Sequence, residues 1–404
     1  MIMDLRFRRV KVGCYIFGVT MAILINLSPV LFLTLRERYG ISYTALASLI
    51  TVNFVTQLLV DLLFSFRPQY FNIQKVVRYA PLPAAVGLAI YGLWPLVLPD
   101  SAHLGLVVGT MIFSASGGLA EVLLSPVIAA IPSPDPDRAM SGLHSAYAWA
   151  VGPVVLLSTA YLHFFGQENW YFLPLFFTAV PLTAFVFLIG AEFPVIPSGH
   201  GAAERTPLKN PTLWLCVAAI FLGGAAENTM AQWGSSYLEG ALGIPKVVGD
   251  VLGVALFSLT LGLGRSLYTK FGTKVERFLY LGSIGAAVCY LIAALCPVPA
   301  VGLIACALVG LCTSLLWPGT LILAAERIPT GGVVMYALLA AGGDLGSSVV
   351  PQLIGLITDA SIGLLPGGEQ TGMKLGMLLG ACCPILAAFI FRRFLCRSEK
   401  IQNS

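Results

Sequence analysis

Long apolar stretches divide this chain, and they constrain its fold more than any other feature of the sequence. A helix needs about 20 predominantly apolar residues to cross the hydrocarbon of a bilayer. Twelve stretches are that long, and none shows the alternating pattern of an outer-membrane barrel strand. The twelve stretches are 12–35, 43–66, 76–98, 104–130, 139–165, 171–191, 212–237, 247–268, 278–296, 301–325, 333–357 and 372–394.

The composition leads to the same fold class. The 404 residues are 57% hydrophobic and 10% charged, whereas a soluble protein carries roughly 25% charged residues. We therefore expect an all-α integral membrane protein with twelve transmembrane helices. Nine irregularly spaced cysteines predict neither a disulfide framework nor a metal site. The sequence has no basic face outside the loops, so it does not predict nucleic-acid binding.

Lysine and arginine are distributed unevenly between the two sets of loops. The loops on the side that holds both chain ends carry 18 of the 23 basic residues, and the opposite loops carry four, with Arg265 at a helix end set aside. Basic loops remain on the cytoplasmic side of a membrane. We therefore expect cytoplasmic termini and a cytoplasmic middle segment, which agrees with an even number of spans.

The polar middle segment separates two halves with matching landmarks. The sequence RYGIS follows the first span, and ALGIP follows the seventh span 203 residues later. Pro126 in the fourth span has a counterpart, Pro318, in the tenth. Paired six-helix halves are typical of secondary transporters. The sequence predicts an N-terminal six-helix bundle (1–191), a cytoplasmic linker (192–210) and a C-terminal six-helix bundle (211–404).

These features make the chain resemble the major facilitator superfamily over its whole length. The loop between the second and third helices of that family usually reads G-x-x-x-D-R-x-G-R. Here QLLVDLLFSFRP keeps Asp61, with Gln57 at the glycine place and Leu62 at the arginine place. The second-half copy, GLGRSLYTKFGTK, keeps Arg265. This loop clamps the cytoplasmic helix ends in the family, so the resemblance implies that Asp61 and Arg265 are gate residues.

At finer grain the chain is similar to the sugar–proton symporters typified by fucose permease. Residues 121–126 read E-x-x-x-S-P, and the next helix contains SGLH and GP. In that branch a fourth-helix acid is followed by Asn-Pro, and Ser125 replaces the asparagine here. The branch also uses a first-helix aspartate, where this chain offers Asn26. The resemblance implies proton–sugar symport, with Asn26 among the substrate-binding residues.

Two ionisable groups interrupt the fourth and fifth spans at a similar depth. An ionisable group at the bilayer centre costs about 2.5–3.5 kcal/mol on insertion scales, so such a group indicates function. We predict that Glu121 is buried and carries the coupled proton, and that His144 assists it or contacts the substrate. The alternative is a structural hydrogen bond that pins the two helices together.

Polar residues near the middle of the seventh and eleventh spans predict a substrate site. The seventh span carries Glu227, Asn228, Gln232 and Trp233, and amides with an indole can bind a hydroxyl-rich ligand. The alternative is polar contact between helices and an interfacial tryptophan. Asp344, in the glycine-rich eleventh span, is also predicted to bind substrate, and its alternative is a salt bridge or cap within the second half.

The sequence therefore predicts a secondary active transporter that moves a small polar solute, such as a sugar, by alternating access with proton coupling. The alternative is a proton-driven efflux antiporter for amphiphilic or cationic compounds, because buried acids also suit cations. No enzyme is expected, since H-E-x-x-H and G-x-S-x-G are absent. We expect no catalytic residue, cofactor or metal, and a monomer in the plasma membrane, most simply a bacterial inner membrane, with solute, protons and lipid as partners.

Overall fold

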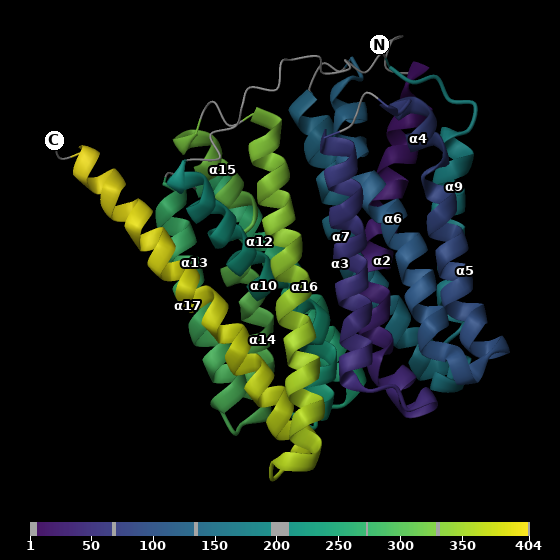
Figure 1. The fold of residues 1–404 in the computed structure, drawn as a ribbon, viewed down its shortest axis with the longest axis vertical. Helices are drawn as coiled ribbons and strands as arrows, with labels where there is room; N and C mark the ends of the chain where they lie inside the picture. The colour runs from purple at the N-terminus through teal and green to yellow at the C-terminus, as the bar shows by residue number, and fades with distance from the viewer. Residues whose placement is uncertain are drawn as a thin grey trace. The chain divides into compact units, whose positions relative to one another are not determined.

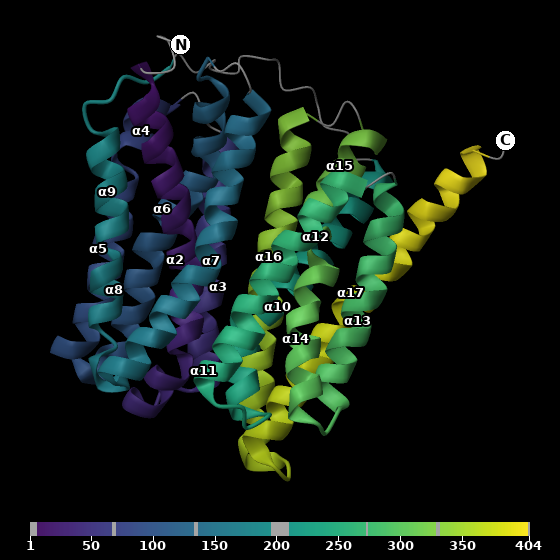
Figure 2. The same ribbon diagram turned by 180° about the vertical axis from the view of Figure 1, so that it is seen from behind.

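A computed structural model describes residues 6–66, 70–132, 136–194, 210–271, 274–328 and 332–402. Every regular element within these ranges is a helix (Figure 1, Figure 2). The all-α fold is thereby confirmed. The helices are α2 (Arg8–Tyr39), α3 (Tyr43–Phe66), α4 (Ile73–Tyr79), α5 (Pro81–Val97), η2 (Pro99–Ser101), α6 (Ala102–Ala129), α7 (Pro136–Phe165), η3 (Gln167–Asn169), α8 (Phe172–Phe177), α9 (Ala179–Leu188), α10 (Pro211–Gly240), α11 (Lys246–Val248), η4 (Gly249–Ala255), α12 (Leu256–Phe271), α13 (Val275–Leu295), α14 (Pro299–Thr313), α15 (Pro318–Arg327), α16 (Gly332–Leu364) and α17 (Gly368–Gln402).

Length and hydropathy of these helices match a multi-pass membrane protein. In the described part of the chain ten helices are long and apolar enough to cross a membrane, and two shorter apolar stretches lie at Trp149–Phe165 and Phe172–Leu188. Large apolar side chains such as Phe164, Leu263 and Phe389 are exposed on the outside. A hydrocarbon solvent accommodates such a surface, whereas water does not.

Several predicted spans consist of more than one helical piece. Proline begins α5 and α15, so the third and tenth spans are each divided there. The eighth span begins with a π-helical stretch, η4, before α12. Proline has no backbone N–H and cannot continue the hydrogen-bond ladder of the preceding helix, which explains the breaks at Pro81 and Pro318.

The contacts between residues divide the chain into two compact units. The first unit contains Met1–Ile41 and Val52–Gly201, and the second contains Ser42–Thr51 and Ala202–Ser404. The first turns of α3 therefore group with the second half of the sequence. The sequence-based division into 1–191 and 211–404 did not anticipate this assignment of residues 42–51.

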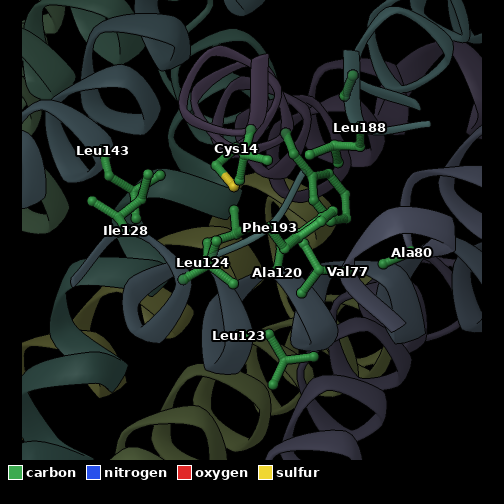
Figure 3. Packing of buried hydrophobic residues seen from close by; sticks show 14 of the residues in the cluster. Cys14, Val77, Ala80, Ala120, Leu123, Leu124, Ile128, Leu143, Leu188 and Phe193 are labelled. Carbon is green, nitrogen blue, oxygen red and sulfur yellow. The ribbon is translucent and has the colours of Figure 1, made fainter. Parts of the chain in front are cut away.

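The first unit packs around an apolar cluster from α2, α4, α6 and the segment after α9. Cys14, Ala120, Leu124 and Phe193 point toward one another in this cluster (Figure 3). Phe193 belongs to the segment predicted as the start of the linker. Its side chain is nearly fully buried, so the linker begins as part of the first unit.

Cations hold the segment after α9 in place. The Arg78 side chain donates to the Ala191 carbonyl oxygen over 2.9 Å, and its guanidinium lies 5.3 Å from the centre of the Phe193 ring. Arg9 donates to the Val186 carbonyl oxygen, and Arg6 forms an ion pair with Glu192. Arginine side chains thereby satisfy carbonyl groups that the end of α9 leaves without helical partners.

In the second unit α10 packs against α16 and α17. The α10 and α16 helices lie side by side in both views (Figure 1, Figure 2). The Tyr290 hydroxyl donates to the Ala226 carbonyl oxygen and the Tyr237 hydroxyl to the Ala293 carbonyl oxygen, each over 2.6 Å. These two buried bonds join α10 to α13 at two levels, and they orient the polar face of α10 toward α12 and α16.

Candidate functional site

Glycine brings α10 and α16 together in the second unit. A Cβ atom placed on Gly224 would lie 2.6 Å from the Gly343 carbonyl oxygen, so only glycine permits this approach. Small residues allow transmembrane helix backbones to come this close. One turn further along each helix, the Asn228 Nδ2 atom donates to the Ser347 hydroxyl over 2.9 Å. The glycine contact thereby places an amide beside a hydroxyl.

The two glycines also leave space for the indole ring of Trp317, which packs against both of them. A Cβ atom on Gly343 would lie 2.3 Å from the Trp317 ring, and one on Gly224 would lie 3.0 Å from it. Trp317 occupies the break between α14 and α15, and it is half-buried. The outer edge of this ring therefore packs on backbone, one helical turn from Asn228. Trp149, a large aromatic residue on α7 of the first unit, is 71% exposed.

A partly buried ion pair lies next to this cluster. The Arg265 guanidinium on α12 is 3.2 Å from the Glu227 carboxylate on α10, and it also donates to the Ser314 carbonyl oxygen over 3.1 Å. The sequence assigned Glu227 to the substrate site and Arg265 to a gate, and the structure brings the two together. The carboxylate of Glu227 is therefore neutralised within the second unit.

The other predicted residues of the second unit are more fully buried than Asn228 and Glu227. Trp233 is fully buried, and its indole N–H donates to the Pro351 carbonyl oxygen over 3.1 Å. Gln232 is nearly fully buried on the same helix, and Asp344 is buried directly after Gly343. The indole N–H of Trp233 is therefore already satisfied within the protein. Trp317, which lies against Gly224 one turn from Asn228, is the better candidate for contact with a ligand.

The predicted residues of the first unit lie in different environments. The Asn26 amide donates to the Ala22 carbonyl oxygen of its own helix over 2.9 Å and is buried. Glu121, which we expected to be buried, is exposed. Its depth along the span can be read from the sequence, but the helix face that carries it cannot. His144 lies on α7, and its side chain is outside the described ones.

The predicted gate residue Asp61 belongs to a row of polar residues on α3 that the sequence interpretation did not recognise as a row. Asn53, Gln57 and Asp61 follow one another at four-residue spacing and are all buried. The Gln57 amide donates to the Asn53 side-chain oxygen over 3.0 Å, and the Ser114 hydroxyl on α6 donates to the same oxygen over 2.6 Å. The four-residue period of polar side chains inside an apolar span was the signal that could have revealed this row.

No metal centre is evident among these groups. Within the described ranges, no three His, Cys, Asp or Glu side chains lie close enough together to hold a metal ion. The polar atoms assembled in the second unit are an amide, hydroxyls and a neutralised ion pair beside an indole. Such a set can bind a neutral polar molecule by hydrogen bonding and stacking.

Comparison of the sequence with models of protein families identifies the family of this chain. The family model of the Major Facilitator Superfamily matches residues 13–351. This chain belongs to the Major Facilitator Superfamily. The superfamily consists of secondary transporters, which fits the expectation that the chain is not an enzyme. No curated protein matches the sequence.

Solved structures of superfamily members share the fold. A bacterial homologue of the human lysosomal transporter Spinster is 13% identical, with a TM-score of 0.78, and 97% of each chain is covered. A D-xylose–proton symporter is 14% identical, with a TM-score of 0.74 and coverage of 96% and 97%. The Escherichia coli fucose–proton symporter is 14% identical, with a TM-score of 0.64 and coverage of 96% and 98%. At this level of identity the likeness establishes the fold.

Proposed function

We propose that this superfamily member is a proton-coupled symporter for a small hydroxyl-rich solute. The observation that carries the proposal is the cluster of Trp317, Asn228 and Ser347 beside the Glu227–Arg265 pair. An aromatic face next to amide and hydroxyl groups suits a sugar-like ring. The sugar–proton symporters among the structural relatives support the same substrate class.

Asn228 and Trp317 are the residues that we assign to the solute. We assign Glu227, Gln232, Trp233 and Asp344 to the surroundings of this cluster in the second unit. Asn26 and His144 remain candidate substrate residues of the first unit. Glu121 is proposed as a proton carrier, and Asp61 and Arg265 remain candidates for the gate implied by the superfamily motif. The bias of basic residues supports cytoplasmic termini. We also propose a bacterial inner membrane as the location.

An efflux antiporter for amphiphilic cations is the second candidate. The acids Glu227 and Asp344 within the membrane favour it, because carboxylates attract cations. Arg265 opposes it, because the ion pair of Arg265 and Glu227 has no net charge with which to attract a cation. The position of Arg265 therefore makes symport of a neutral solute the better supported of the two functions.

Transport by purified protein in proteoliposomes tests the proposal. Labelled sugars and amphiphilic cations are offered with and without an imposed pH gradient. We expect a sugar to accumulate when the outside is acidic, and Trp317→Ala to raise its KM about tenfold or more, within the range for loss of a single pocket contact. Accumulation of cations alone, or no response to the gradient, would reject proton–sugar symport.

A further inference from the structure

Helices α3 and α6 pack in a fixed register within the first unit. The Ser114 hydroxyl on α6 donates to Asn53 on α3, which forms the first rung between the two helices. Four residues further along α3, Gln57 lies against Gly117 and Gly118 of α6. Residue numbers increase together on both helices, so α3 and α6 run in the same direction.

The approach at the second rung is very close. A Cβ atom on Gly118 would lie 3.1 Å from the Gln57 Cα and 3.0 Å from the Val60 Cβ, and one on Gly117 would lie 3.3 Å from the Gln57 amide nitrogen. Because both helices advance one turn in about four residues, the next rung pairs Asp61 with Glu121.

The environments of these two carboxyl groups differ. Asp61 is 6% exposed, and its Oδ1 atom is buried without a hydrogen-bond partner in the described part of the chain. Glu121 is accessible from outside the unit. Two carboxylates so placed repel each other in a poorly solvated site, and one bound proton removes the repulsion.

We propose that Asp61 and Glu121 together form the proton-binding site of this transporter and share a single proton. This inference rests on the proposed proton coupling, and it gives Asp61 a role in proton binding beyond the gate. In the protonated state one carboxyl donates its O–H to the other carboxylate. On deprotonation the proton leaves through Glu121, the accessible member, to the compartment that it faces.

Other titratable groups lie on the helices packed against α6. Helix α4 contributes Arg78, whose guanidinium is held by the Ala191 carbonyl oxygen and the Phe193 ring. Helix α2 contributes the buried thiol of Cys14, and helix α5 contributes the buried phenol of Tyr91. Helix α7 contributes Tyr147 and His144, of which the latter has a side chain outside the described ones. To distinguish the shared proton from titration of these other groups, the experiment changes only Asp61 and Glu121.

An infrared titration of the purified protein in lipid nanodiscs, without substrate, tests the pair. The band of protonated carboxyl groups is recorded across pH for the wild type, Asp61→Asn and Glu121→Gln. We expect two separated steps from the pair in the wild type, and one step at a changed midpoint in each variant. Glu168→Gln, which removes an exposed carboxyl elsewhere in the first unit, should leave both steps in place.

Two further variants keep the result interpretable. Asp61→Glu retains a carboxyl group at the buried position and should restore two steps. If Asp61→Asn does not fold, Glu121→Gln still reports the midpoint of Asp61, because a substitution at the accessible residue is tolerated more easily. The proposal is overturned if each carboxyl titrates at the same midpoint whether or not the other is present.

The failure of this inference can be told apart from failure of the proposed function. Wild-type proteoliposomes that never accumulate solute under a pH gradient would reject proton symport, whatever the titration shows. Gradient-driven accumulation combined with two independent carboxyl titrations would reject only the shared proton. Under the inference, both Asp61→Asn and Glu121→Gln lose accumulation and retain exchange of solute, whereas a residue that acts only as a gate slows both processes.

Discussion

The carboxylate of Asp359 accepts a 3.0 Å hydrogen bond from the backbone amide of Tyr43. Its second oxygen accepts from the next amide, at Thr44, over 2.6 Å. These amides belong to the first turn of α3, where helical partners are missing and the helix dipole favours a negative charge. Asp359 on α16 therefore caps a helix from a distant part of the sequence, and it ties residues 42–51 to the second unit.

Removing this cap should lower thermal stability. We expect Asp359→Ala to cost about 0.5–2 kcal/mol, the usual range for loss of a helix N-cap, and Asp359→Asn to cost less, because an amide oxygen still accepts. The melting temperature followed by tryptophan fluorescence measures both. Asp100→Ala, at an exposed position of η2, is the control and should change little. Equal melting temperatures for Asp359→Ala and the wild type would contradict the capping role.

The ion pair of Glu227 and Arg265 should behave as a coupled unit. Removing either charge leaves its partner's charge uncompensated in a partly buried place, which destabilises more than removing both. We expect Glu227→Gln and Arg265→Gln each to reduce the yield of folded protein, and the double variant to recover part of it. A double-mutant cycle on melting temperatures should show coupling of about 0.5–3 kcal/mol. Additive effects would show that the pair contributes nothing jointly.

The glycine seat of Trp317 can be disturbed with a single methyl group. A Cβ atom at Gly343 would lie 2.3 Å from the indole ring, so Gly343→Ala must displace the ring. We expect a higher KM and altered tryptophan fluorescence, with the protein still folded. Gly262→Ala is the matched control, since no atom lies within 4 Å of the added Cβ there. An unchanged KM for Gly343→Ala would remove Trp317 from the substrate site.

Glu121→Gln should separate solute exchange from accumulation. The amide resembles the protonated acid but can neither release nor bind a proton. We therefore expect the variant to exchange labelled for unlabelled solute across the membrane, and to fail to concentrate solute under a pH gradient. Counterflow and gradient-driven uptake in the same proteoliposomes measure the two processes. Accumulation at the wild-type level would show that the coupled proton binds elsewhere, with Glu227 and Asp344 as the next candidates.

The contact between Arg6 and Glu192 should respond to pH. The hydrogen bond from Arg6 holds the pKa of the Glu192 carboxyl below its ordinary value of 4.5, and the positive charge of Arg6 acts in the same direction. A depressed pKa in the folded state means that the contact stabilises above the ordinary pKa and is lost as pH falls through the lowered value. Both groups are exposed, so the effect should be small and screened by salt.

Hydrogen exchange of the segment after α9 measures this effect. Glu192→Gln should speed exchange at the Ala191 amide at neutral pH, as acidification should in the wild type after correction for intrinsic rates. High salt should produce the same change. If exchange at Ala191 is the same in the variant and the wild type, the ion pair does not hold this segment.

Sequence alone determined the membrane character, the all-α fold and the family of this protein. Each of these properties depends on local composition: a span of about 20 apolar residues satisfies its own backbone in lipid wherever its neighbours lie. The depth of Glu121, Glu227 and Asp344 along their spans followed from the same count. The thickness of the bilayer fixes the length of each span and the depth of its residues, independently of the other helices.

Only the tertiary structure decided which polar groups meet. Hydropathy places Arg265 near the end of its span, but it does not reveal that this residue turns toward Glu227. The seat of Trp317 depends on Gly224 and Gly343, whose missing side chains act only when two helices cross there. The pairing of Asp61 with Glu121 depends on the register of α3 and α6. Lipid solvates every apolar face of a helix equally well, so the bilayer does not select one rotation or register. Packing between segments that are distant in the sequence decides both.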